Sequence, residues 1–367
     1  MPPPRGARSA RRSVAVGEAI VVPVERVGLE LDEFLCLVFP ERSKGFLRAQ
    51  IRAGKITIDG QAAHPSARLK ISQVVLLEQD PEEWPEINAP ERGPELPILH
   101  EDEHLLVIDK PAGLACEPER WDKDKASLAS AVLDLARARA QAAGTELPLD
   151  WRPRLLHRLD KDTTGVALVA KTLECERAVR AAFESGAVEK VYLALVEGEY
   201  PLRDGEEDRI EFALAPDARR SGRMVVDALE GKHAETLVRV AQRFRGYTLV
   251  ECRPQTGRTH QIRVHLAERG FPLVVDPLYG RRRAFALSEF KPGYRKKRGQ
   301  TERPLIERHT LHAARLSLEL FGARRAFEAP VPADLERALK QLARHRAPRE
   351  GRDGKVGGEG ANRGVGA

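Results

Sequence analysis

Apolar residues recur at helical spacing in two adjacent segments near the start of the chain. LDEFLCLVF (31–39) and SKGFLRAQIRAG (43–54) each place apolar side chains on one face, which predicts two short helices. The second segment opens with a serine and closes with a glycine, residues typical of helix ends. KITIDGQ (55–61) then alternates as a strand does and contains an Asp-Gly turn, and LKISQVVLLE (69–78) predicts a further extended run.

The second predicted helix has a basic face. Leu47 and Ile51 share its apolar side, while basic residues recur every four positions on another side and continue just beyond the helix: Lys44, Arg48, Arg52 and Lys55. Taken alone, such a face is more often simply solvated. The order of helix, basic helix, hairpin and strand resembles the S-four RNA-binding domain, although Glu30 stands where that family usually has an arginine. This resemblance implies that the four basic residues bind RNA phosphates and that binding weakens steeply with salt.

The rest of the chain alternates between strand and helix patterns. HLLVIDKPAGLA (104–115) predicts a strand followed by a turn, and residues 127–144 predict a helix. RLLHRL and VALVAKT predict two extended segments separated by DKDTTG, so Asp160 lies where one segment leaves for the next. Residues 173–185 predict a helix.

Two later segments complete the predicted elements. In EKVYLALVEGEY (189–200), Val191, Leu193 and Leu195 should face one way and Tyr192 the other. A helix should begin near Thr259 and end at Gly270. Its start, with Arg258 and His260 beside it, is a candidate anion site for an RNA phosphate or a carboxylate.

Composition shifts predict the domain boundaries. Residues 80–103 carry nine acids, one arginine and five prolines, a composition typical of a linker, while residues 281–300 carry eight basic residues and one acid, typical of a loop. The predicted divisions are a disordered basic tail (1–18), an S-four-type domain (19–80), an acidic, proline-rich linker (81–97), a catalytic domain (98–342) containing a basic loop (281–303), and a disordered tail (343–367).

Charge and cysteine content narrow the class of protein. Lys+Arg number 61 against 55 Asp+Glu, giving a net charge of +6, and the four cysteines form no C-x-x-C pair. The cysteine pattern predicts neither a disulfide framework nor a zinc cluster, and fits a reducing cytoplasm. No apolar run is long enough for a membrane span. His260 with His265, and His309 with His312, lack the cysteine or carboxylate partners that would complete a metal site, so we expect no metal.

Five stretches occur in an order that resembles the RluA family of RNA pseudouridine synthases. They are KPAG, HRLDKDTTGVALVAK, EKVYLALVEG, TGRTHQIRVHL with the following DPLYG, and LHAARLSL leading into FEAPVPADL. KPAG or H-R-L-D alone would carry little weight, whereas the five together are specific. The resemblance covers about residues 98 to 339. It implies an α+β fold with a central mixed, mostly antiparallel sheet flanked by helices, and conversion of uridine to pseudouridine without a metal or cofactor.

The resemblance also implies roles for individual residues. Asp160 is the catalytic group, Tyr192 lies against the target base and assists proton removal from carbon 5, and Arg263 pairs with Asp160 and favours its charged form. Whether Asp160 attacks the sugar, attacks the base or abstracts a proton stays open. The target nucleotide should be flipped out of its helix, with Arg158 filling the gap. The other implied substrate-binding and turn-forming residues are His157, Thr163, Thr164, Gly165, Arg258, Thr259, His260 and Gln261.

Several alternatives remain. Judged without the family, Asp160 is more simply a strand-end cap, Tyr192 a half-buried strand aromatic and Arg263 a solvated helix residue. The chain could also be a non-catalytic RNA-binding or ribosome-assembly protein, or a hydrolase that releases uracil. By analogy with the family, the expected substrate is large-subunit ribosomal RNA, within or outside a pre-ribosomal particle, and the alternative is tRNA. The protein is expected to be a cytoplasmic monomer.

Overall fold

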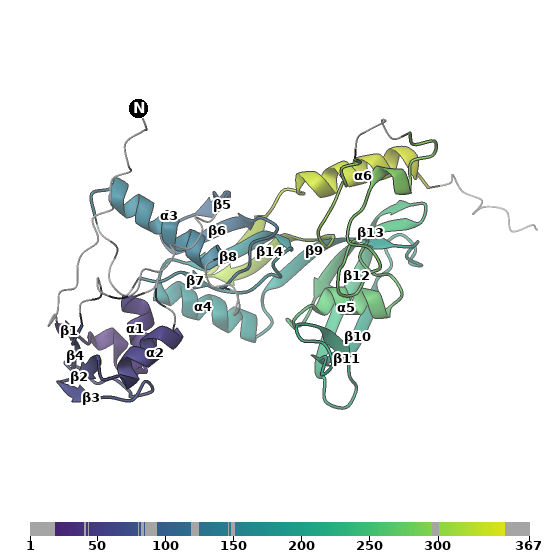
Figure 1. Ribbon diagram of the computed structural model, residues 1–367. Coiled ribbons are helices and arrows are strands. Elements are labelled where there is room, and N and C mark those ends of the chain that lie inside the picture. Colours follow the sequence, from purple (N-terminus) through teal and green to yellow (C-terminus); the bar gives the residue numbers. More distant parts are fainter. Residues whose placement is uncertain are drawn as a thin grey trace, which may run out of the picture. The chain divides into compact units, whose positions relative to one another are not determined.

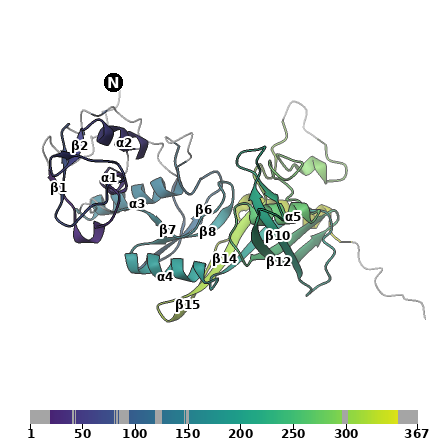
Figure 2. The ribbon, with the colours of Figure 1, turned by 90° about the horizontal axis from the view of Figure 1, so that it is seen from below.

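A computed structural model of the chain describes residues 19–39, 42, 44–79, 81, 84, 94–118, 125–145, 147, 151–295 and 301–348 (Figures 1 and 2). These residues fall into two compact units, one within Met1–Pro94 and Glu117–Pro153 and the other within Glu95–Cys116 and Arg154–Ala367. The predicted tail 1–18 and most of the predicted linker and C-terminal tail lie outside the described residues. No helix among the described residues is long and apolar enough to span a membrane.

The first unit contains a small antiparallel sheet and three α-helices among its described residues. The sheet order is β1-β4-β2-β3, with β1 Ala19–Val21, β2 Ile56–Ile58, β3 Gln61–Ala62 and β4 Val74–Leu77. The helices are α1 Leu31–Val38, α2 Lys44–Arg52 and α3 Leu128–Ala142. The three predicted helices and the hairpin are therefore confirmed. β4 is shorter than predicted because a turn with Ser72 at φ 62° interrupts the run, and β1 was not predicted.

The apolar faces of α1 and α2 form the core of this unit. Leu31 and Leu35 of α1 and Leu47 and Ile51 of α2 are almost fully buried, and they pack with Val75 and other residues of the small sheet. Helical spacing places these side chains on one side of each helix, as the sequence pattern predicted.

The helix α3 begins with a reciprocal pair of serine hydrogen bonds. The Ser127 hydroxyl accepts the Ser130 N–H, while the Ser130 hydroxyl accepts the Ser127 N–H, so two N–H groups that the helix leaves without a partner are satisfied. This helix groups with the first unit although its sequence lies within the range predicted for the catalytic domain.

The second unit is built on one large sheet. Its main order is β11-β10-β12-β13-β9-β14-β8-β6-β5, with β15 on β14 and β7 on β8. β8 and β14 pair in parallel, and every other described pair is antiparallel, which confirms the mixed, mostly antiparallel α+β fold. The strands are β5 Ile98–Glu101, β6 Leu105–Lys110, β7 Arg154–Leu155, β8 Thr164–Ala170, β9 Glu189–Glu197, β10 Asp208–Pro216, β11 Met224–Val226, β12 Lys232–Phe244, β13 Tyr247–Pro254, β14 Leu311–Leu320 and β15 Ala323–Glu328.

Three α-helices of the described residues cover this sheet: α4 Leu173–Glu184, α5 Gln261–Glu268 and α6 Ala333–His345. Ile262 of α5 shares a core cluster with Ala194 of β9, whereas Leu335 of α6 shares another with Leu195. Successive residues of a strand point to opposite faces, so α5 and α6 cover opposite faces of the sheet, as the ribbon also shows (Figure 1). α6 reaches His345, past the predicted domain end at 342.

The described part of the basic segment is irregular, as predicted, but it is anchored. It contains one short 3-10 helix, η3 Leu287–Glu289, and Phe285 bridges to Ile306. Phe285 and Phe290 are buried, and their rings stack 4.9 Å apart. Phe285 and Phe290 pack with Leu195 and Tyr247 of the sheet, so two aromatic side chains attach the described part of this segment to the sheet.

Candidate active site

One row of residues crosses five neighbouring strands beside the predicted catalytic turn. Lys110 of β6 pairs with Gly165 of β8, Gly165 with Ala313 of β14, Ala313 with Tyr192 of β9, and Tyr192 with Cys252 of β13. The sheet brings Tyr192 close to the turn before β8, because only β14 lies between these two strands.

Gly165 is required at its place in this row. Its φ is +112°, and a β-carbon built on it would lie 2.1 Å from the Ala313 carbonyl oxygen. Both the backbone conformation and the close approach of β14 therefore exclude a larger residue.

We expect Gly165→Ala to lower the free energy of unfolding by roughly 2–5 kcal/mol, from backbone strain together with overpacking. Urea unfolding of the variant measures this loss. Gly257→Ala is the matched control, because a β-carbon there meets nothing within 4 Å. Equal stability of the two variants would contradict this role of Gly165.

The turn that carries Asp160 is fixed by its own backbone. The Thr163 N–H donates to the Asp160 carbonyl at 3.0 Å, and the Leu159 N–H donates to Cys116 Sγ at 3.2 Å. The residues on both sides of Asp160 are thus held by hydrogen bonds.

A buried lysine supports the same turn from the KPAG segment. Lys110 is fully buried, and its Nζ donates to the carbonyls of Pro111, Leu114 and Lys161 at 2.9, 2.7 and 2.9 Å. Because all three ammonium hydrogens have acceptors, Lys110 ties the KPAG turn to the residue directly after Asp160.

Two threonine–histidine pairs attach the turn to the segment that enters β14. Thr163 Oγ1 lies 2.7 Å from His309 Nε2, and Thr164 Oγ1 lies 2.9 Å from His312 Nδ1. All four side chains are buried. These ring nitrogens are therefore engaged by hydroxyl groups within the protein, and the threonines support the turn.

Buried histidines should make the protein less stable in acid. Burial lowers the pKa of His309 to about 3 and that of His312 to about 4. In the unfolded chain a histidine titrates near pKa 6.5, so between these values the unfolded state binds more protons than the folded state. The free energy of unfolding should therefore be highest above about pH 6.5 and fall as the pH is lowered, by up to about 1.4 kcal/mol per pH unit for each such histidine.

Urea unfolding between pH 7.5 and 4.5 measures this slope. His309→Gln removes one of the titrating groups, so its stability should fall less steeply than that of the wild type over the same range. Parallel slopes would show that His309 is not a buried neutral group.

Arg263 joins two carboxylates at this turn. Its Nη1 donates to Asp160 Oδ2 at 2.8 Å, while Nε and Nη2 donate to Asp276 Oδ2 and Oδ1 at 2.7 and 2.9 Å. Asp276 is fully buried and also accepts the N–H groups of Leu278 and Tyr279. The two-pronged bond to Asp276 fixes the guanidinium plane, and one hydrogen-bond donor remains directed at Asp160.

The charges of this group stabilise one another. Burial alone would lower the pKa of Arg263, but its hydrogen bonds and charge interactions with Asp276 and Asp160 raise it. Burial would likewise raise the pKa of Asp276, but Arg263 and the two backbone N–H groups lower it. Arg263 is thus a permanent cation beside Asp160, whose side chain keeps 24% of its surface exposed. Solvent exposure leaves the Asp160 carboxylate accessible to a substrate.

Tyr192 is a neutral phenol in this environment. It packs with the cluster that includes α5, opposite to Leu193 and Leu195, as predicted. Burial raises the pKa of its hydroxyl, and the negative charge of Asp160 adds to that effect. A phenol with a raised pKa stays protonated at neutral pH, so Tyr192 is suited to packing and hydrogen bonding in that form.

Two further predicted site residues hold the surrounding backbone. His157 Nε2 accepts the Leu168 N–H at 3.1 Å. Gln261 is buried, and its side-chain amide is bound to four neighbours: Glu235, Thr236, Thr256 and Arg258. Both side chains are therefore occupied within the protein, like Thr163 and Thr164.

The remaining predicted residues face solvent or the carboxylate. Arg158, Arg258 and Thr259 are exposed, and His260 Nε2 lies 3.9 Å from Asp160 Oδ2. α5 begins at Gln261, two residues later than predicted. The exposed residues are available to a bound RNA, and Thr259, where the helix was predicted to begin, lies outside α5.

Sequence reasoning missed five residues of this region: Lys110, Asp276, Tyr279, His309 and His312. Lys110, Asp276 and Tyr279 lie in the KPAG and DPLYG motifs. The motifs therefore marked these residues, but the sequence did not show which side chains they contact. His309 and His312 were considered only as metal ligands. The pairing of each residue depends on strand order, which the local pattern did not provide.

One group of possible metal ligands occurs among the described residues, and two of its three members are exposed. Glu211, His233 and Glu235 have ligand atoms within 4.8 Å of one another. Arg209 Nη2 donates to Glu235 at 2.9 Å, so a cation already neutralises part of this group. The arrangement is typical of a surface ion-pair network.

The basic ridge of the first unit, Lys44, Arg48, Arg52 and Lys55, is partly neutralised. Asp32 is buried, and its carboxylate pairs with Arg48 Nε at 2.5 Å and with Lys44 Nζ at 3.3 Å. Lys55 Nζ donates to Gln79 at 2.9 Å, and Arg52 is exposed. α2 thus carries Lys44, Arg48 and Arg52, with Lys55 beyond its end, and the first two share the Asp32 carboxylate.

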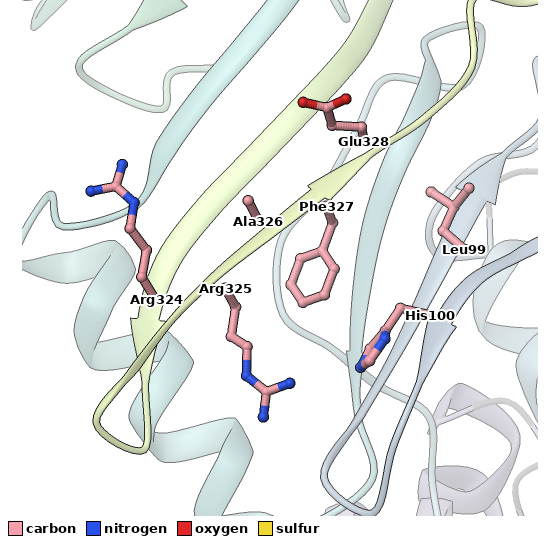
Figure 3. A pocket seen from close by; sticks show the side chains of 7 residues that line it. All are labelled: Leu99, His100, Arg324, Arg325, Ala326, Phe327 and Glu328. Atoms are coloured by element: carbon pink, nitrogen blue, oxygen red, sulfur yellow. The ribbon is translucent and has the colours of Figure 1, made fainter.

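The cavities formed by the described residues include two in the second unit. One of about 370 Å³ lies between the outer strands β5 and β15 and is lined by residues that include His100, Arg325 and Phe327 (Figure 3). It contains none of the predicted site residues. The other, of about 280 Å³, borders the turn that carries Asp160 and is lined in part by Lys110 and Thr164.

Comparison with known proteins shows which family the chain belongs to. Residues 104–268 match the family described as RNA pseudouridylate synthase. "Ribosomal large subunit pseudouridine synthase D" of Pseudomonas aeruginosa is 37% identical over 90% of this chain and 97% of its own length, and the protein of that name from Xanthomonas campestris is 34% identical over 88% and 91%. The solved structure of "Human RNA Pseudouridylate Synthase Domain Containing 1" is 23% identical, covers 66% of this chain and 86% of its own, and has a TM-score of 0.47. The chain therefore belongs to the RluA family of RNA pseudouridine synthases, isomerases that convert uridine to pseudouridine in RNA.

Proposed function

We propose that this isomerase acts on large-subunit ribosomal RNA, with Asp160 as its catalytic group and without a cofactor. The observation that carries the catalytic assignment is the Arg263 bridge, which directs a fixed cation at a partly exposed carboxylate. The proposed RNA class is supported by the names of the relatives from Pseudomonas aeruginosa and Xanthomonas campestris. The protein is proposed to work as a cytoplasmic monomer.

In this proposal Asp160 acts on the flipped uridine, and Arg263 keeps the carboxylate oriented during the reaction. Tyr192 lies against the base as a protonated phenol. Arg158, which is exposed on the same turn, is available to fill the gap left by the flipped nucleotide.

The first unit is proposed to hold the RNA through an S-four-type surface. Arg52 and Lys55 are the members of the basic ridge that Asp32 does not neutralise, so they should contribute most to phosphate binding. The neutralised pair, Lys44 and Arg48, should contribute less than the pattern of basic residues alone would indicate.

Tritium release from transcripts labelled at carbon 5 of uracil tests the RNA class. Replacement of the carbon 5 hydrogen is inherent in forming the new carbon–carbon bond, so modified uridines release tritium to water. We expect release from unmodified large-subunit rRNA and none from tRNA transcripts. Release from tRNA alone would contradict the proposed substrate while leaving the isomerase activity intact.

A further inference from the structure

Tyr279, in the DPLYG segment, connects three parts of the active site. Its hydroxyl accepts the Met224 N–H at 2.8 Å and lies 2.9 Å from His260 Nδ1. The guanidinium of Arg263 lies 5.2 Å from the centre of its ring. Tyr279 therefore contacts β11, the start of α5 and the cation that binds Asp160.

His260 is held in an unusual conformation between Tyr279 and Asp160. Its backbone is left-handed, with φ 55° and ψ 16°, a region that residues with a β-carbon seldom adopt. Its Nε2 lies 3.9 Å from Asp160 Oδ2. That distance is too long for a direct hydrogen bond, and it leaves Nε2 facing the space beside the carboxylate.

The hydrogen on the neutral imidazole can be placed from these contacts. Burial lowers the pKa of His260, and the charge of Arg263 lowers it further. The charges of Asp160 and Asp276 raise the pKa but do not outweigh burial. A neutral imidazole has one N–H, and an unprotonated nitrogen facing an anionic carboxylate would be repelled. The hydrogen therefore belongs on Nε2, and the Tyr279 hydroxyl donates to Nδ1.

We infer that Tyr279 is a positioning residue that holds His260 with its Nε2–H directed beside the Asp160 carboxylate, where it donates a hydrogen bond to an oxygen of the target uridine. When the bond from the sugar to the base breaks, its electron pair stays on uracil and spreads to the carbonyl oxygens. A neutral donor stabilises that charge without giving up its proton. This inference rests on the proposed function and places His260 beside the reacting nucleotide.

Four single variants, one of them a control, and one double variant test the inference in the tritium-release assay with the rRNA transcript. Tyr279→Phe removes the hydroxyl alone. His260→Asn tolerates the left-handed backbone but is too short to place a donor where Nε2 lies, whereas His260→Gln can place one there. Tyr200→Phe is the control, because its hydroxyl binds Asp208, away from the site.

Tyr279→Phe should lower kcat about tenfold, the size of one positioned hydrogen bond, while KM stays within about twofold. The acid limb of its pH profile should move to higher pH, because His260 loses the donor that favours its neutral form. His260→Gln should keep more activity than His260→Asn, and Tyr279→Phe combined with His260→Asn should be no slower than His260→Asn alone. Unchanged kcat in Tyr279→Phe, or additive losses in the double variant, would overturn the inference.

A second readout does not need turnover. The ring ¹⁵N shifts of His260 in the histidine-labelled full chain report which nitrogen carries the hydrogen. In the wild type we expect the hydrogen on Nε2, and in Tyr279→Phe we expect this protonation pattern to change. A hydrogen on Nδ1 in the wild type would overturn the inference. A wild type without tritium release on either RNA would count against the proposed function, and the spectrum would still decide the role of Tyr279.

Discussion

Asp160→Ala should abolish tritium release, with kcat lowered by at least about 10⁴-fold, the scale on which loss of an essential catalytic group acts. The variant should fold, because Arg263 keeps its two-pronged bond to the buried Asp276 when Asp160 is removed. RNA affinity should change little, since most of the binding free energy is expected from contacts between basic side chains and phosphates.

Filter binding and thermal unfolding of the same preparation separate the possible causes of lost activity. Normal binding and stability with no turnover would place Asp160 in the chemical step. Full activity of Asp160→Ala would show that another group performs the reaction.

Asp276→Ala should have the second largest effect, on stability and on activity together. Of the two carboxylates bound to the buried Arg263 guanidinium, the variant keeps Asp160. Removing one member of a buried ion pair lowers the free energy of unfolding by about 3–5 kcal/mol. Arg263 would also lose the fixed plane that directs it at Asp160. A misplacement of about 1 Å can lower kcat about 100-fold.

Urea unfolding and the tritium assay measure the two effects. Glu336→Ala is the control, since its pair with Lys340 is exposed and should be worth less than about 1 kcal/mol. A loss in Asp276→Ala no larger than in Glu336→Ala would contradict the central place of Asp276.

Local patterns predicted the helices α1 to α5 and the strands that flank the turn carrying Asp160. They succeeded where one face is buried, as in α1 and α2, because helical spacing then repeats in the sequence. The strands β5 and β10 to β15 and the helix α6 were not predicted, although those strands form much of the large sheet. β12 with β13, and β14 with β15, form hairpins between consecutive strands whose sequence pattern was not recognised. The pairing of β14 with β8 and β9 joins distant segments, which no local pattern encodes.

The site was predictable only in part for the same reason. The family motifs pointed to Asp160, Tyr192 and Arg263, and the first and last of these are joined by a hydrogen bond. The second carboxylate on Arg263 and the histidine partner of Thr163 come from segments that follow α5, and only the fold brings them to the turn. The sequence also left open which residues face the substrate. In the structure Gln261 is buried, whereas Arg258 and Thr259 are exposed and can face a bound RNA.

Analysis of the nucleosides produced by the wild type tests the proposed reaction most directly. After incubation with the unmodified large-subunit rRNA transcript, the RNA would be digested and its nucleosides separated alongside any free base. We predict pseudouridine in an amount equal to the tritium released, with no free uracil. Free uracil together with abasic RNA would contradict this prediction, because the enzyme would then cut the bond to the base without rejoining it.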